Sequence, residues 1–161
     1  MVEKTSHDPA RPFRLLLVGV DGSEGARRAL GWAAALSRAT GAQVLAVHVL
    51  TYSRELLHDV MPETMRTWRR DLETDLRTLW VEPLVAADVR HRAMVVEGES
   101  PATGLLEVAD REGADVVIVG ARDHGGIADR VLGGVSYRVT HRAHQPVVVV
   151  PPEWPAPEAH G

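Results

Sequence analysis

The stretch Arg14-Leu-Leu-Leu-Val-Gly-Val20, which leads directly into Asp21-Gly-Ser23, decides the fold of this chain. A short, continuous apolar run predicts a central strand of a parallel sheet with helices covering both faces. Asp-Gly-Ser supplies turn chemistry, and Ser23 can cap a helix that follows. From Ala26 onward, apolar residues recur at helical spacing until Gly41, which is placed to end the helix.

The rest of the chain repeats this alternation of strand and helix. Further strands are predicted at residues 43–50, 89–96, 115–120 and 146–150, and the third is expected nearer an edge because its apolar pattern is only partial. Strands that alternate with helices are joined in parallel by right-handed crossovers. The predicted fold class is therefore α/β: a three-layer, doubly wound open sheet of five parallel strands with helices on both faces.

The chain from Pro62 onward contributes three of the predicted helices. A long one is expected to begin at Pro62 and to end or bend at Pro83. Two shorter ones are expected at residues 101–112 and 135–143. Apolar residues recur on one face of the long helix, which predicts a buried stripe of Met65, Trp68, Leu72, Leu76 and Leu79.

Length and composition limit the organisation of the chain. Its 161 residues suit one domain, predicted at 14–151, between a flexible N-terminus at 1–13 and a proline-rich flexible tail at 152–161. A net charge of −4 with dispersed basic residues argues against a nucleic-acid surface. No apolar run approaches the roughly 20 residues that span a bilayer, so no membrane association is expected. The N-terminus has no apolar export segment, and we expect a cytoplasmic location.

Residue types that the chain lacks exclude several kinds of chemistry. It has no cysteine, and Lys4 is its only lysine, so thiol catalysis, a P-loop lysine and a Schiff-base lysine are all ruled out. No nucleophile stands beside an evident base. The histidines and carboxylates show no zinc-protease spacing, and no resident metal site is predicted. We expect at most a weak ATPase activity.

The loop after the fourth predicted strand, residues 120–136, is the leading candidate for a ligand site. Glycines near its two ends let backbone N–H groups approach an anion, and the helix that follows favours a phosphate at its N-terminus. Ser136 could add a hydroxyl. Asp21 ends the first strand at the same crevice, where a carboxylate can accept from a ribose. The alternatives are that the glycines only build tight turns and that Asp21 only accepts a turn N–H.

Several segments, in order and spacing, resemble the universal stress protein family. They are Val18-Gly-Val-Asp-Gly-Ser-Glu-Gly-Ala-Arg-Arg-Ala-Leu30, Ala46-Val-His-Val49, Val95-Val-Glu-Gly-Glu-Ser-Pro101, the loop from Gly120, and His144-Gln-Pro-Val-Val-Val-Val150. The resemblance extends from about Arg14 to Pro151.

The ATP-binding branch of that family has the signature Gly-x2-Gly-x9-Gly-Ser/Thr. On this chain its first and third glycines are Gly120 and Gly133, while Asp123 takes the place of the second glycine and Gly134 that of the Ser/Thr. Asp123 would repel a triphosphate unless it ligates an accompanying Mg²⁺. The resemblance implies a nucleotide site made by Gly19, Val20, Asp21, Val49, Val119, Gly120, Arg122, Gly133, Gly134, Val135 and Ser136.

Two functions of different kinds remain open from the sequence. The resemblance implies a stress-response module that binds ATP or another adenine nucleotide, with or without Mg²⁺. The nucleotide would lie between the loops after the first and fourth strands. The alternative is an interaction protein of the same fold that no longer binds ATP, for which Asp123 and Gly134 are the evidence. The resemblance also implies a homodimer formed through the last strand, Val147–Val150, with a protein partner unknown.

Overall fold

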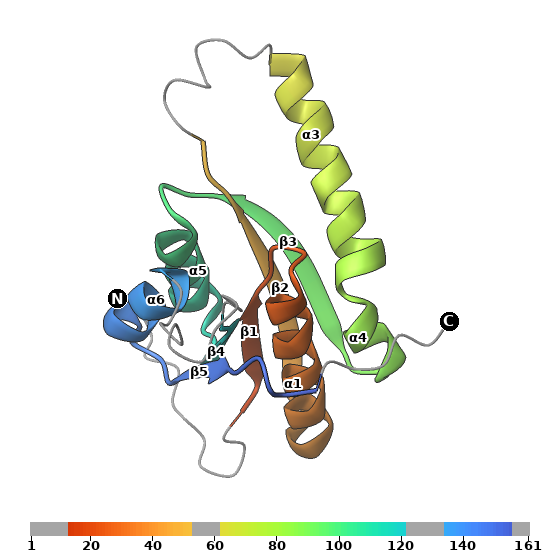
Figure 1. The fold of residues 1–161 in the computed structure, drawn as a ribbon, viewed down its shortest axis with the longest axis vertical. Helices are drawn as coiled ribbons and strands as arrows, with labels where there is room; N and C mark the ends of the chain where they lie inside the picture. The colour runs from red at the N-terminus through yellow and green to blue at the C-terminus, as the bar shows by residue number, and fades with distance from the viewer. Residues whose placement is uncertain (1–12, 53–61, 122–133, 156–161) are drawn as a thin grey trace.

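The computed structural model describes residues 13–52, 62–121 and 134–155, and these contain a five-stranded parallel sheet (Figure 1). The strand order is β3-β2-β1-β4-β5, so the chain builds outward first on one side of β1 and then on the other. The α/β doubly wound fold predicted from the sequence is confirmed. The strands are β1 (Leu15–Gly19), β2 (Gln43–Leu50), β3 (His91–Glu97), β4 (Val116–Gly120) and β5 (Val147–Val150).

Helices cover both faces of the sheet, which gives the three layers visible in Figure 1. One face carries α1 (Glu24–Thr40) and α4 (Glu82–Ala86), with α3 (Pro62–Asp75) and the π-helical turn η1 (Leu76–Trp80) leading into α4. The other face carries α5 (Pro101–Glu112) and α6 (Gly134–Arg142).

The apolar run that opens the domain supplies both halves of the core. Leu16 and Val18 point into the cluster beneath α1, whereas Leu15 and Leu17 point into the cluster beneath α5. Successive side chains of a strand face opposite sides, so a strand covered on both faces must be apolar at every position. This is why β1 shows no polar alternation.

The predicted helix boundaries of α1 are confirmed in atomic detail. The Ser23 side chain accepts a hydrogen bond from the Ala26 N–H at 3.2 Å, which caps the first turn. Gly41 has a left-handed φ of 77°, and its N–H donates to the Ser37 carbonyl at 2.7 Å. Glycine is the residue that adopts this conformation without strain.

Strand boundaries differ from the predictions by one or two residues. The third strand spans His91–Glu97 rather than 89–96, and the fourth begins at Val116 rather than at Asp115. The Asp115 carboxylate accepts the N–H groups of Arg14 and Leu15 at 2.6 and 2.9 Å, so it joins the start of β4 to the start of β1. Asp115 therefore stands just before β4, with its carboxylate hydrogen-bonded to the start of β1. The apolar pattern alone does not reveal this contact.

The buried stripe predicted on the long helix is wrong. No residue of α3 is buried, Trp68 is 49% exposed and Leu79 is 62% exposed, and of the five residues only Leu76 in η1 is buried. In Figure 1, α3 extends past the other helices, which agrees with the absence of buried residues on it. The long helix also gives way to the π-helical turn before Pro83, where its end or bend was predicted. Pro83 instead occupies the first turn of α4.

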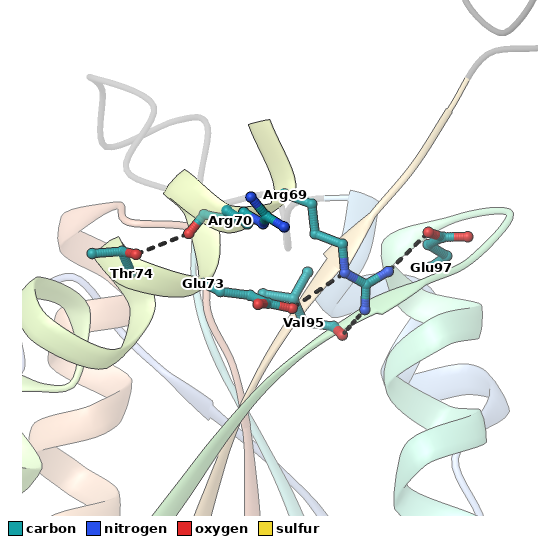
Figure 2. A network of polar contacts seen from close by, with 6 residues as sticks. All are labelled: Arg69, Arg70, Glu73, Thr74, Val95 and Glu97. Carbon is teal, nitrogen blue, oxygen red and sulfur yellow. Dashed lines mark hydrogen bonds and ion pairs between the residues drawn. The ribbon is translucent and has the colours of Figure 1, made fainter. Parts of the chain in front are cut away.

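A polar network holds α3 to the edge strand β3 (Figure 2). The Arg69 guanidinium pairs with Glu97 at 2.9 Å and with Glu73 at 3.2 Å, and it donates to the Val95 carbonyl at 3.1 Å. These contacts raise the pKa of Arg69, chiefly through the hydrogen bond to Glu73. The attachment of α3 therefore combines these polar contacts with the packing of Leu72 against the core beneath α1.

The ends of the chain fall mostly outside the described residues. Residues 1–12 and 156–161 are not described, so the predicted flexible ends stay predictions. Just after β5 the Trp154 N–H donates to the Pro151 carbonyl at 3.1 Å in a turn. Among the helices that the structure describes, none is long and apolar enough to cross a membrane.

Candidate functional site

A cavity of about 400 Å³ opens at the carboxyl ends of β1 and β4. The connections that follow these neighbouring strands run to opposite sides, because β1 leads to β2 and β4 leads to β5. The order β3-β2-β1-β4-β5 thus reverses between β1 and β4. Open α/β sheets bind ligands at such a switch point, where the connecting loops diverge and leave a crevice. The topology thus explains why the cavity lies here.

The turn after β1 forms one wall of this cavity and is held rigidly. The Asp21 carboxylate accepts the Ser23 N–H through Oδ1 at 3.0 Å, as the turn interpretation of Asp21 predicted. Gly22 has a φ of +81°, and a side-chain carbon there would lie 2.9 Å from the ring of Trp80. Asp21 also lines the cavity, so the turn role and a ligand role do not exclude each other.

His48 at the end of β2 joins this turn to the π-helical segment. Its Nδ1 lies 2.7 Å from the Val20 carbonyl, which can only accept a hydrogen bond, so Nδ1 carries the proton. Its ring meets Trp80 edge to face, with centroids 5.2 Å apart. His48 also lines the cavity, and its contact with the Val20 carbonyl engages Nδ1 but not Nε2 of its ring.

Gly120 has a packing role that the ligand interpretation did not foresee. A side-chain carbon at Gly120 would lie 2.2 Å from the Gly25 carbonyl oxygen, and one at Gly25 would lie 2.9 Å from the Ala121 oxygen. The first turn of α1 thus rests backbone to backbone against the end of β4. Glycine is required at both positions whether or not a ligand binds.

Apolar side chains line the part of the cavity beneath α5. Leu105 lies over Gly19, where a side-chain carbon would be 2.7 Å from the leucine Cδ1. Val49 packs equally closely on Gly104, at 2.6 Å by the same measure. Glycines on facing elements let α5 approach the strand ends and narrow the cavity to a slot with apolar walls.

The start of α6 closes the remaining side. Ser136 is 3% exposed and its hydroxyl donates to the Gly120 carbonyl at 3.1 Å. In the structure this hydroxyl ties α6 to the end of β4, and its role toward a ligand stays a prediction. Gly134 is the first residue of α6, one position before the predicted start at residue 135, and no described residue lies within 4 Å of where its side-chain carbon would be.

Most of the predicted site residues meet at this one cavity. Those that line it are Gly19, Val20, Asp21, Val49, Val119, Gly120, Val135 and Ser136. Gly134 lies beside them at the start of α6 but is not part of the lining. Arg122, Asp123 and Gly133 lie outside the described residues.

Sequence reasoning did not assign Gly25, Arg28 or Leu105 to the site, although all three line the cavity. Gly25 sits inside the first turn of a helix, where glycine is unfavourable, and this was the available signal. Leu105 was assigned to the core from its helical spacing, and it serves both core and cavity. Arg28 gave no signal, because its side chain reaches the cavity only through the placement of α1.

Metal-binding side chains do not gather anywhere in the described parts of the chain: no group of three or more histidines and carboxylates is found there. His141 and His144 are both exposed. His144 faces Asp110 at 3.4 Å instead of forming a cluster with His141.

The doubly wound sheet with a cavity at its switch point places the chain among the open α/β proteins, a class whose ligand sites lie at the carboxyl ends of the strands. The model of the universal stress protein family matches residues 12–151. The chain belongs to this family, and the resemblance seen in the sequence is confirmed.

Three relatives illustrate how far the similarity extends. The "Universal stress protein in QAH/OAS sulfhydrylase 3'region" of Thermus aquaticus is 30% identical over 138 residues, covering 86% of this chain and 98% of its own. A universal stress protein of Mycolicibacterium smegmatis is 32% identical over 93% of this chain, which spans only 49% of that longer protein. The crystal structure of a universal stress protein in complex with cAMP superposes with a TM-score of 0.66 at 25% identity, covering 86% and 96% of the two chains.

Proposed function

We propose that this protein binds an adenine nucleotide in the cavity between the ends of β1 and β4 and acts as a nucleotide-responsive module in a stress response. The observation that carries the proposal is the convergence of eight predicted site residues on one cavity of about 400 Å³. Such a cavity is in the range that small-molecule ligands occupy.

The wall chemistry supports an ordered binding mode. Val49, Leu105 and Val119 offer an apolar slot for the adenine ring. Asp21 still has one carboxylate oxygen free of the turn hydrogen bond, and it can accept from ribose hydroxyls. The N-terminus of α6 presents backbone N–H groups and the positive end of its dipole to a phosphate.

The cAMP-bound relative adds support from a separate direction. It shares the fold with this chain over nearly its whole length at 25% identity. An adenine nucleotide therefore fits at least one protein with this architecture. We accordingly propose adenine nucleotides as the ligand class of this chain, with ATP, which the resemblance implies, as one member of it.

Equilibrium binding by isothermal titration calorimetry tests the proposal. AMP, cAMP, ADP and ATP are titrated with and without Mg²⁺, and saturable one-site binding of at least one of them is expected. Asp21→Asn removes the ribose acceptor's charge and should weaken binding about tenfold, the loss of one charge-assisted hydrogen bond. No heat or shift in melting temperature at millimolar concentrations of all four nucleotides would overturn the proposal.

Gly134 offers a gain-of-affinity test at the signature position. Within the part of the chain that the structure describes, nothing lies within 4 Å of the position where a side-chain carbon would be, so serine fits there. Gly134→Ser restores the hydroxyl of the family signature and should tighten phosphate binding by about threefold to tenfold. Gly134→Ala, which adds the carbon without the oxygen, is the matched control and should leave affinity unchanged.

A second function is favoured by a specific observation. Gly120 and Ser136 are both explained by contacts inside the protein, the first by the approach of Gly25 and the second by its hydrogen bond. Two residues of the inferred site therefore need no nucleotide to account for them. An interaction protein of the same fold that binds no ATP accommodates these facts, and the titrations above separate it from the leading proposal.

We also propose a homodimer formed through β5. This strand lies at the edge of the sheet, and its Val147 to Val149 remain partly exposed. Pro146 and Val150 carbonyls accept from β4, so by the alternation of a parallel ladder the N–H of Val149 faces the open edge. Val149→Pro removes that donor and should convert the dimer to a monomer in sedimentation equilibrium. A wild-type chain that sediments as a monomer at micromolar and at millimolar protein concentration alike would contradict the homodimer.

A further inference from the structure

Arg28 is a charged residue in the cavity wall whose role is not explained by the fold. It lies in the second turn of α1, one turn after Glu24, and both side chains line the cavity with Asp21. Its Nη1 is buried and has no hydrogen-bond partner within the described parts of the chain. Neither of the two nearby carboxylates pairs with it.

The neighbouring arginine shows what a purely structural role looks like on this helix. Arg27 points to the other side of α1 and pairs with Glu82 at 2.8 Å, which joins α1 to α4. Arg28 has no equivalent contact among the described residues. A buried donor of a charged group is unfavourable when unpaired, because folding removes its water without supplying another acceptor.

We propose that Arg28 is the residue that recognises the anionic group of the ligand, so that the cavity selects a phosphorylated nucleoside over a free nucleoside. This inference rests on the proposed nucleotide-binding function and adds to it a specificity-determining side chain from α1. Arg28 lines the cavity, where its guanidinium can offer two parallel donors to a pair of phosphate oxygens. A turn of the side chain toward such a phosphate gives the buried Nη1 an acceptor.

The charges around the cavity are consistent with this assignment. Asp21 and Glu24 are acceptors suited to hydroxyl or amino groups of a ligand and would repel a phosphate. Arg28 is the one arginine among the lining residues that the structure describes. His48, which also lines the cavity, uses its Nδ1 for the Val20 carbonyl.

The test compares adenosine with AMP on the wild-type chain and on Arg28→Gln by calorimetry. For the wild type, AMP should bind more tightly than adenosine. In Arg28→Gln, AMP affinity should fall by about tenfold to a hundredfold, the range for a hydrogen bond to a charged group, while adenosine affinity stays within twofold. Arg28→Lys, which keeps the charge without the planar fork, should recover part of the loss.

Arg38→Gln is the matched control, since Arg38 is an exposed arginine in the last turn of the same helix. It should change neither affinity. The melting temperature of ligand-free Arg28→Gln should equal or exceed that of the wild type, because an unpaired buried donor is removed; a structural role would lower it.

The outcomes separate this inference from the function it depends on. Adenosine and AMP weakened equally in Arg28→Gln, or neither weakened, would overturn the role of Arg28 while leaving nucleotide binding in place. A wild-type chain that binds neither compound would overturn the proposed function itself, and the assignment of Arg28 with it.

Discussion

Helices α1 and α3 have similar amphipathic sequences but opposite fates in the fold. Helix α1 buries six residues, among them Leu30 at 1% exposure. Helix α3 buries none, and Trp68 on its apolar side is 49% exposed. Both patterns predict a buried face, but only α1 has β1 and β4 beneath it over its length.

The difference teaches that periodicity identifies a face without supplying its partner. Helix α1 follows a central strand and must return across the sheet, so its apolar face meets the core. Helix α3 comes before the edge strand β3 and extends past the other helices, as Figure 1 shows. It is held at one point by Arg69, whose contacts Figure 2 shows, and at its base by Leu76.

The largest expected effect contrasts one leucine from each side of this comparison. Leu30→Ala should lower the free energy of unfolding by about 3 kcal/mol, because it leaves a cavity beneath α1. Leu79→Ala should cost less than about 0.5 kcal/mol, because that side chain is 62% exposed. Urea denaturation of the two variants measures both values, and equal losses would show that the exposed face of the α3 and η1 segment is covered in solution.

The close approach of α1 to β4 gives the next effect. Gly120→Ala places a carbon 2.2 Å from the Gly25 carbonyl oxygen, and since both groups are backbone neither can move aside cheaply. We expect a loss of about 2 kcal/mol in thermal or urea denaturation. Gly134→Ala has open space and is the control, with an expected change near zero. A Gly120→Ala variant as stable as the wild type would mean that α1 does not rest on β4 as described.

The anchoring of α3 gives a smaller effect. Arg69→Met removes the pairs to Glu97 and Glu73 and should cost about 0.5 kcal/mol, since partly exposed ion pairs contribute little each. Arg70→Met, on the same helix, has no ion pair among the described residues and should cost almost nothing. Hydrogen exchange sharpens the result: α3 amides should exchange faster in Arg69→Met and unchanged in Arg70→Met. Equal exchange in both variants would remove Arg69 as the anchor.

The smallest effect is a pH dependence at Tyr52, which follows β2. Burial, and then the Glu97 carboxylate, raise the pKa of Tyr52 above its ordinary value of 10.0, while Arg69 opposes them. A raised folded-state pKa gives stability that is present below pH 10 and lost as pH rises through that pKa. Stability should therefore fall less steeply above pH 10 in Tyr52→Phe than in the wild type. Identical alkaline slopes in urea denaturation would contradict the raised pKa.

The accuracy of the sequence predictions follows how local each feature is. The cap at Ser23 and the stop at Gly41 depend on residues within a few positions, and both are confirmed. Gathering Asp21, Val49 and Gly120 at one crevice followed from the topological rule for parallel strands, and the structure places all three at the cavity. The hydrogen bond of the Ser136 hydroxyl was not foreseen, because its acceptor is a carbonyl 16 residues away that no local pattern indicates.

The sequence by itself determined the α/β class, the order of the elements and the edge of the sheet where a ligand can bind. Continuous apolar strands and local helix signals are sufficient for these, since both act over neighbouring residues. Only the tertiary structure decided that α3 keeps its apolar face exposed, that Gly120 is needed by Gly25, and that Arg28 enters the cavity wall. Each depends on which surfaces meet when distant segments pack, and amino-acid pattern along one segment carries no information about the surface opposite.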